Sequence, residues 1–172
     1  RELIDRYSLR QKKIVEIGCG KGDFLDLLCS LGSNQGYGFD TSYDATRQAD
    51  RSREDVTFIR GYYGERYKEL SADLVCCRHA LEHIHRPVDF LKMLRKTIGA
   101  KTPAIFFEVP NALFTLRDLA IWDLIYEHCG YFTSLSLSRL FIEAGLTPLN
   151  LEEAFGGQYL CIEGHAANQD RE

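Results

Sequence analysis

The sequence predicts a doubly wound α/β fold built on a mostly parallel sheet. Strand-like and helix-like patterns alternate along the first two thirds of the chain, and a glycine-rich turn follows the first apolar run. Two further strand-like runs flank Phe155-Gly156-Gly157 near the end. Alternating strands and helices place successive strands in parallel with helices on both faces. A glycine turn between two strands makes an antiparallel hairpin, so we expect the sheet to end in one.

Seven strands are predicted, each from a short apolar run bounded by turn residues. Five precede the hairpin, at residues 13–17, 36–39, 56–59, 73–77 and 104–109, and the hairpin adds residues 147–154 and 158–162. The fourth is an apolar run that suits a central strand covered on both faces. Pro110 cannot donate a ladder hydrogen bond, so it is expected to end the fifth strand.

Six helices are predicted from apolar positions spaced three or four residues apart. They cover residues 3–9, 23–31, about 41–50, 87–98, 112–125 and 134–144. Thr41 or Ser42 is the expected cap of the third helix. Pro87 occupies the first position of the fourth, and Gly145 ends the last.

Length, charge and cysteine content narrow the class of protein. A chain of 172 residues fits one domain, over residues 1–172, with a sizeable core. The net charge is −4 and no lysine- and arginine-rich run occurs, so no nucleic-acid partner is expected. No apolar run is long enough for a membrane span, and no signal pattern opens the chain. Six cysteines without C-x-x-C pairing indicate free thiols in a cytoplasmic protein and no metal site.

The glycine turn after the first strand indicates a cofactor. Gly18, Gly20 and Gly22 occupy alternate positions, where they allow a tight turn and a close approach of a ligand to the backbone. Asp23 stands where a dinucleotide fingerprint has its third glycine, at a helix N-terminus that normally receives a phosphate. That carboxylate, with Glu16 inside the strand, favours a cationic ligand without phosphates. The alternative is a purely structural turn.

Residues 16–22, Glu-Ile-Gly-Cys-Gly-Lys-Gly, resemble the first motif of class I S-adenosylmethionine-dependent methyltransferases. The resemblance implies a Rossmann-like, seven-stranded sheet, S-adenosylmethionine as cofactor and S-adenosylhomocysteine as product. It also implies cofactor contacts from Glu16, Gly18, Cys19, Gly20 and Gly22. An NAD-dependent oxidoreductase and a non-catalytic cofactor-binding module of the same fold are the alternatives.

Two more strand ends are expected to contact the cofactor. Asp40 ends the second strand about twenty residues after the glycines, the spacing at which an acid accepts hydrogen bonds from ribose hydroxyls. Its alternative role is to cap the following helix. After the third strand, many methyltransferases place an acid that binds the adenine amino group. Gly61 occupies that position here, and Tyr62 beside it is expected to cover the adenine ring.

The loop after the fourth strand is similar to the fourth motif of the family, which passes the methionine end of the cofactor. It begins with Arg78 and His79, and both are assigned to the cofactor site. The alternative for His79 is a hydrogen-bonded structural histidine. Glu82 and His83 are expected to shape the turn or cap the next helix.

A second motif indicates the acceptor side of the reaction. Tyr126-Glu127-His128, followed by Tyr131-Phe132-Thr133, looks like a segment of sugar C-methyltransferases and their relatives. In that family a Tyr-x-His pair in this segment handles the acceptor. The resemblance therefore implies catalytic roles for Tyr126, Glu127 and His128. By composition alone, the segment also fits a solvated loop that ends a helix.

The chemistry agrees with this assignment, because a carbon or oxygen acceptor must lose a proton and histidine is the usual base. His128 is the expected base for a small-molecule acceptor, with a sugar or sugar-nucleotide carbon as one candidate. Tyr126 would polarise or protonate an oxygen, and Glu127 would orient the histidine or bind a hydroxyl. Sugar C-methyltransferases carry a cysteine-rich zinc segment before this core and a further domain after it, and this sequence shows neither. It is therefore either a core fragment or a compact relative with a different acceptor.

Overall fold

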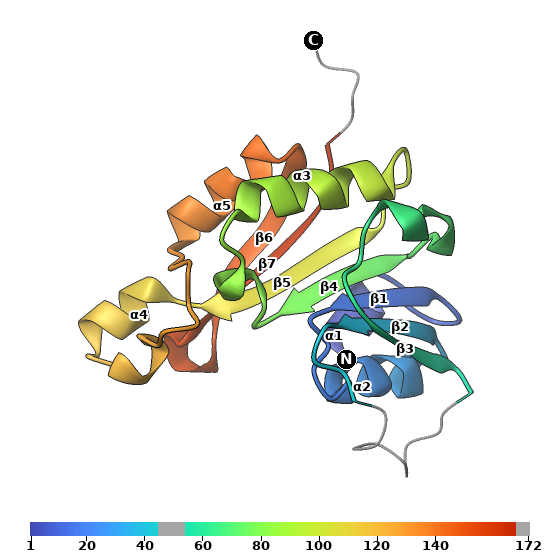
Figure 1. Ribbon diagram of the computed structural model, residues 1–172, viewed down its shortest axis with the longest axis horizontal. Helices are drawn as coiled ribbons and strands as arrows, with labels where there is room; N and C mark the ends of the chain where they lie inside the picture. Colours follow the sequence, from blue (N-terminus) through green and yellow to red (C-terminus); the bar gives the residue numbers. More distant parts are fainter. Residues whose placement is uncertain (45–53, 168–172) are drawn as a thin grey trace.

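The computed structural model describes residues 1–44 and 54–167, which form one mixed sheet with helices on both faces (Figure 1). The seven strands lie in the order β3-β2-β1-β4-β5-β7-β6. The strands are β1 (Lys13–Ile17), β2 (Gln35–Asp40), β3 (Val56–Arg60), β4 (Leu74–Arg78), β5 (Ala104–Pro110), β6 (Leu146–Ala154) and β7 (Tyr159–Ala166). The first five are parallel, and β7 pairs antiparallel with both β5 and β6. The predicted fold class and the terminal hairpin are thus confirmed.

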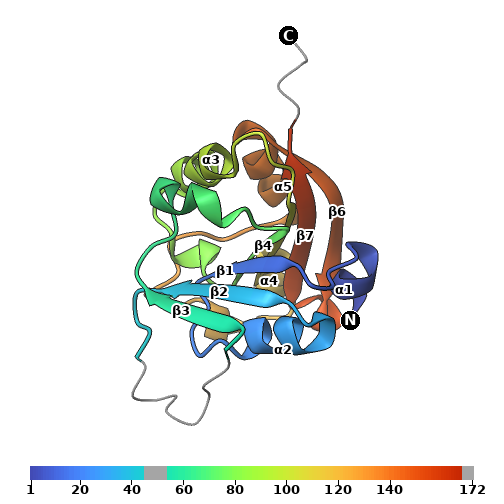
Figure 2. The ribbon, with the colours of Figure 1, turned by 90° about the vertical axis from the view of Figure 1, so that its right-hand side faces the viewer.

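Hydrophobic clusters lie on both faces of the sheet, and helices cover both faces (Figures 1 and 2). On one face lie α3 (Pro87–Ile98), α5 (Ser134–Glu143) and the 3-10 helix η2 (Glu65–Leu70); on the other lie α1 (Glu2–Arg6) and α2 (Asp23–Gly32). Strand side chains alternate between the faces, so Val15 packs on the α3 side and Ile14 on the α2 side. The same alternation directs Glu16 toward α2.

The strand order reverses direction at β1, which lies between β2 and β4. Ligands of doubly wound sheets bind at such a switch point, outside the carboxyl ends of the strands. The residues that leave β1, β2 and β4 at that edge are Gly18, Thr41 and His79. This edge is therefore where the fold predicts a site.

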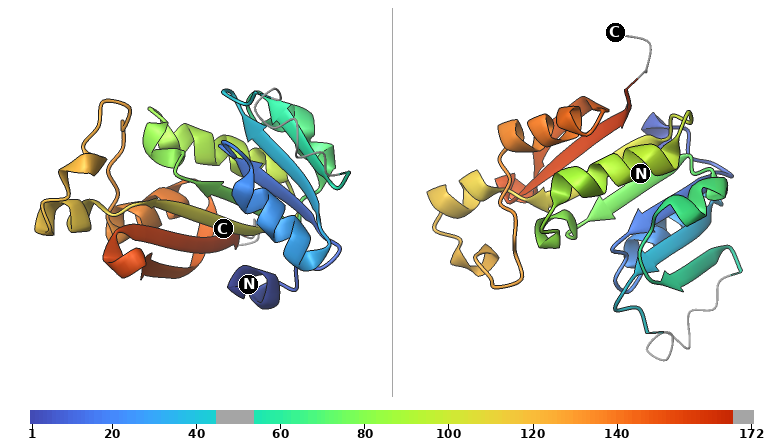
Figure 3. Two further views of the ribbon diagram at one scale, coloured as in Figure 1. Left: turned by 90° about the horizontal axis from the view of Figure 1, so that it is seen from below. Right: turned by 45° about the horizontal axis from the view of Figure 1, so that its top comes forward.

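The longest predicted helix is wrong. In place of one helix over residues 112–125, the chain forms α4 (Ala112–Arg117) and, after a break, the 3-10 turn η4 (Ile121–Asp123). The break falls at Leu119, whose φ of 51° is left-handed and incompatible with an α-helix. Ala120, fully buried, donates its backbone N–H to Thr115 and turns the chain back. As a result, α4 and the residues after it project from one end of the sheet (Figure 3).

Other elements agree with expectation within a few residues. The leading helix is shorter than predicted, because Ser8 takes a φ of 50°. The predicted helix toward residue 50 falls largely on residues 45–53, outside the described part of the chain. All six cysteines are free, and Cys129 is exposed whereas the other five are buried. None of the helices in the described ranges combines the length and apolar character needed to cross a membrane.

Candidate active site

A cavity of about 350 Å³ opens at the carboxyl ends of the central strands. Its lining comes from the ends of β1 to β4 and from the start of α3: Ile17, Gly18, Phe39, Asp40, Thr41, Gly61, Tyr62, Tyr63, His79, Ala80, His83, Ile84 and Phe90. The volume lies within the range of small-molecule sites. A groove of about 580 Å³ beside Lys96 and Gly145 lies at the opposite ends of the strands and contains none of the predicted site residues.

The glycine turn forms the floor of this cavity. Gly18 has a φ of 71°, and a Cβ added to it would lie 2.5 Å from the Cβ of Ala80. The Gly18 N–H donates to the backbone carbonyl of Phe39, which ties the turn to β2. Gly22 is the N-cap residue before α2 and has a φ of 80°, and a Cβ there would enter the ring of Phe58. Glycine is therefore required at both positions, for backbone conformation and for space.

Asp40 joins the glycine turn to the end of β2. Its Oδ2 accepts from the Gly20 N–H at 2.8 Å, and its Oδ1 accepts from the backbone and hydroxyl of Ser42 at 2.7 and 2.6 Å. Burial raises the pKa of this carboxyl, but the hydrogen bonds from Ser42 and Gly20 outweigh it and hold the pKa below its usual value. A carboxylate can accept about four hydrogen bonds. Asp40 therefore stays charged and keeps capacity for a ligand.

Tyr62 and Tyr63 follow β3, and both line the cavity. Tyr62 is 80% exposed on the rim of the cavity. Tyr63 is buried, with its ring 5.1 Å from that of Phe39 in an edge-on contact. The Gly61 N–H donates to the Asp40 carbonyl at 3.1 Å and supplies no side chain to the site. The predicted place of Tyr62 at an exposed cavity wall is consistent with its covering a flat ring.

Glu16 lies beneath the glycine turn and does not line the cavity. It is 2% exposed, and burial raises its pKa to about 8, although the charge of Arg78 opposes this. Among the described residues, its Oε2 atom has no hydrogen-bond partner. Cys19 is also buried, with its sulfur against the backbone of Gly38. These two residues, with Gly20 and Gly22, support the cavity from below.

The end of β4 is fixed by Glu108 of β5. Arg78 donates to Glu108 Oε1 from Nε at 3.1 Å and from Nη2 at 2.7 Å, and it lies over the ring of Phe24. His79 Nε2 lies 2.7 Å from the same oxygen, and the His79 backbone N–H donates to the Glu108 carbonyl. Burial opposes ionisation of Glu108, but the bonds from His79 and Arg78 lower its pKa to about 2. His79 lines the cavity, whereas Arg78 points to Glu108.

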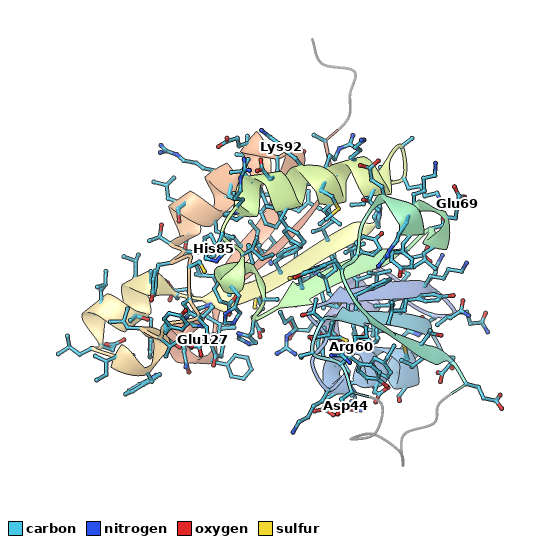
Figure 4. All side chains as sticks on the ribbon, in the orientation of Figure 1. Asp44, Arg60, Glu69, His85, Lys92 and Glu127 are labelled. Atoms are coloured by element: carbon cyan, nitrogen blue, oxygen red, sulfur yellow. The ribbon has the colours of Figure 1, made fainter. Side chains whose placement is uncertain are left out.

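The predicted acceptor segment reaches this edge of the cavity through one residue. His128 is half-buried, and its ring lies 4.9 Å from that of His83, which lines the cavity. Tyr126 is 98% exposed and Glu127 is exposed, so neither side chain is held in the site. The Glu127 backbone carbonyl is nonetheless bonded to His83 Nδ1 at 2.9 Å. Figure 4 shows Glu127 at the base of the projecting α4 segment.

Sequence analysis missed the role of His83 and the apolar part of the lining. It assigns His83 to a turn, and the structure does place it in the 3-10 helix η3 (Leu81–His83), but with the side chain at the cavity. The available signal was the position of His83 four residues after His79 in one strand-end loop. Phe39, Tyr63 and Phe90 come from three separate elements, and no local pattern links them.

Comparison with known proteins agrees with this geometry. The family model described as a methyltransferase domain matches residues 1–151. A ubiquinone biosynthesis O-methyltransferase of Cupriavidus pinatubonensis is 28% identical over 156 residues, which cover 81% of this chain and 61% of that protein. The chain therefore spans about three fifths of the length of that relative.

Solved structures share the fold at low sequence identity. A SAM-dependent methyltransferase from Aquifex aeolicus superposes with a TM-score of 0.71 at 11% identity, over 96% of this chain and 88% of that one. The 1,6-didemethyltoxoflavin-N1-methyltransferase of Burkholderia thailandensis gives 0.71 at 14% identity, over 96% and 76%.

The glycine turn generates a stability prediction. Gly18→Ala and Gly20→Ala both place a side chain at positive φ, which costs about 1–2 kcal/mol. Only Gly18→Ala also meets another atom, because nothing lies within 4 Å of a Cβ at Gly20. Urea unfolding should therefore show Gly18→Ala less stable than Gly20→Ala by about 1–3 kcal/mol, the usual cost of overpacking. Equal losses would contradict the assigned contact with Ala80.

Glu108 generates a prediction on pH. Its pKa is about 2 in the folded chain against an ordinary value of 4.5, so its charge stabilises the folded state above pH 4.5. That stabilisation is lost as the pH falls toward 2. The difference in unfolding free energy between wild type and Glu108→Gln should be on the order of 3 kcal/mol at pH 7 and shrink steadily below pH ~4.5. Glu152→Gln, exposed on β6, is the control and should show no such narrowing.

Proposed function

The chain belongs to the methyltransferase domain family, and from that premise we propose that it transfers a methyl group from S-adenosylmethionine to a hydroxyl-bearing small molecule. One observation carries the proposal: the charged Asp40 carboxylate and the glycine turn meet in a cavity at the switch point of the sheet. Doubly wound sheets bind their cofactors at this place.

The residues around the cavity fit the donor. Asp40 already accepts three hydrogen bonds and keeps capacity for about one more, from a ribose hydroxyl, and Tyr62 offers a ring face on the rim for the adenine. The N-terminus of α2 carries Asp23 in its first turn, which disfavours a phosphate. His79 and Ala80 follow β4 and line the cavity on the side away from β3 and Tyr62. The methionine part of the cofactor would lie on that side. When bound, S-adenosylmethionine supplies a methyl group already activated on a positively charged sulfur.

His128 is the group that removes the proton from the acceptor. Its Nδ1 lies 2.8 Å from the backbone carbonyl of Asp123, and a carbonyl oxygen only accepts hydrogen bonds. In the neutral ring Nδ1 therefore carries the proton, and Nε2 presents a lone pair. His128 Nε2 would take up the proton of the acceptor hydroxyl, whose oxygen would receive the methyl group that S-adenosylmethionine supplies. Tyr126 and Glu127, both exposed, would contact an acceptor that covers them.

The surface beside the site favours an apolar acceptor with a hydroxyl group. Large apolar side chains of the α4 to η4 segment are exposed, among them Leu116, Leu119, Ile121 and Trp122 at 65–76%. Such a patch marks a binding surface. The relative named a ubiquinone biosynthesis O-methyltransferase supports an oxygen acceptor. A sugar carbon is the second candidate, supported by the resemblance of the Tyr126 to Thr133 segment to sugar C-methyltransferases.

Calorimetric titration tests the cofactor. S-adenosylhomocysteine should bind the wild-type chain, and NAD should not. Asp40→Ala should weaken that binding about 10- to 100-fold, because hydrogen bonds to a charged acceptor contribute about 1.5–3 kcal/mol. Asp118→Ala, exposed on the projecting segment, should bind as the wild type does. Binding of NAD without binding of S-adenosylhomocysteine would refute the proposal.

A second measurement tests His128 and the acceptor together. Formation of S-adenosylhomocysteine is followed with a panel of catechols and phenols and with nucleotide-linked keto sugars. On the best acceptor, His128→Ala should lose about 10²- to 10⁴-fold in turnover, the usual contribution of a general base. Its affinity for S-adenosylhomocysteine should stay within a few-fold. His165→Ala, a histidine on β7 away from the cavity, should retain full turnover; unchanged turnover of His128→Ala would exclude the base role.

A further inference from the structure

Three potential metal ligands meet at the edge of the cavity. Glu82, His83 and His128 each offer one ligand atom, and these atoms lie within 4.8 Å of one another. Two belong to η3 after β4, and the third comes from the segment after η4, so the cluster forms only in the folded chain. Two imidazoles and one carboxylate are a donor set that catalytic zinc sites use.

Backbone hydrogen bonds orient both histidines. His83 Nδ1 lies 2.9 Å from the carbonyl of Glu127, and His128 Nδ1 lies 2.8 Å from the carbonyl of Asp123. Each Nδ1 must donate, which leaves each Nε2 with an available lone pair. Histidines that bind metals are typically fixed in this way, by a carbonyl or carboxylate at the other ring nitrogen.

The burial of Glu82 is a second, independent observation that supports a bound ligand at this cluster. It is only 1% exposed, and its Oε2 has no hydrogen-bond partner among the described residues. A buried carboxylate oxygen without a partner is costly unless a ligand satisfies it. Oδ2 of Asp123 is likewise buried and without a described partner, which adds to the negative character of the same region.

The two segments are also held in place without any ligand. The carbonyl of Glu82 accepts from the backbone N–H groups of Cys129 at 2.8 Å and Gly130 at 2.9 Å. These bonds connect the residue after His128 directly to η3. The ligands are therefore brought together before an ion arrives, so less ordering accompanies binding.

We propose that Glu82, His83 and His128 bind one divalent transition-metal ion of the zinc type at the acceptor side of the cavity. Zinc–nitrogen bonds of about 2.0–2.1 Å require the ligand atoms to lie within about 4 Å of each other. The observed spacing therefore needs only small side-chain movements. Because His83 lines the cavity, an ion held by these residues would lie beside the space open to a substrate.

This inference rests on the proposed function and narrows its acceptor to molecules that can coordinate through a hydroxyl oxygen. A divalent ion lowers the pKa of a bound hydroxyl. The proton then leaves to water, and the bound oxygen forms its bond to the methyl carbon as the sulfur–methyl bond breaks. With the ion bound, His128 Nε2 is a ligand; without it, His128 acts as the base.

Titration of the chelator-treated full chain with Co²⁺ alone, followed by visible absorption, tests the site directly. One ion should bind per chain. Loss of partners one shell beyond a metal already weakens binding about 10- to 100-fold, so His83→Ala and His128→Ala should each weaken Co²⁺ at least ~10-fold. His83 is exposed and His128 half-buried, so neither change should unfold the chain. Glu82→Gln should have the same effect on Co²⁺.

Two controls make the result specific. His165→Ala should bind Co²⁺ as the wild type does. Cys129→Ser tests the alternative pair formed by Cys129 and His85, whose sulfur and Nε2 atoms lie 3.7 Å apart. Binding lost in Cys129→Ser but kept in His83→Ala would overturn the proposal, as would no binding at all. S-adenosylhomocysteine affinity, measured in the presence of chelator, separates the cases: its loss counts against the proposed function, and its retention without Co²⁺ binding counts only against the metal site.

Discussion

The arrangement of the site depends on the contacts of the Glu108 carboxylate with Arg78 and His79. Both residues lie at the end of β4. The strand that carries Glu108, β5, pairs with β4 on one side and with β7 on the other. Held in this way, the chain leaves β4 with His79 at a φ of 50°, a conformation that few residues adopt without support. This exit places Ala80 against Gly18, so the loop after β4 closes directly on the glycine turn.

The loop after β4 also positions the residues on the acceptor side of the site. Two residues after Ala80, the Glu82 carbonyl accepts from Cys129 and Gly130, and His128 is thereby brought to His83. Donor and acceptor halves of the site are therefore linked through one loop. A change at Glu108 would be transmitted through this loop to both halves, because Ala80 packs against Gly18 and the Glu82 carbonyl is hydrogen-bonded to Cys129 and Gly130.

Much of this arrangement could be predicted, and the rest depends on contacts between distant segments. The strands, the glycine turn and Asp40 follow from local patterns, because period, turn chemistry and strand-end spacing are encoded within a few residues. The partner of Arg78 is thirty residues away in sequence, at Glu108, and was not predictable from the loop itself. The contact of His83 with His128 and the helix break at Leu119 likewise depend on how α4 packs at the end of the sheet. The spacing of apolar residues within one segment does not predict that packing.

Two buried glutamates, Glu108 and Glu16, have different protonation states because their surroundings differ. Glu108 is held by Arg78 and by hydrogen bonding to His79 and has a pKa of about 2, so it is charged at neutral pH and fixes the end of β4. Burial raises the pKa of Glu16 to about 8, against the lowering effects of the Arg78 charge and a backbone hydrogen bond from Leu25, so Glu16 is mostly protonated at neutral pH. A neutral Glu16 suits its place in the core, where one carboxylate oxygen has no hydrogen-bond partner among the described residues. The family motif has an acid at this position, and here that acid is buried beneath the glycine turn and does not line the cavity, so its contribution to the site is structural support of the turn.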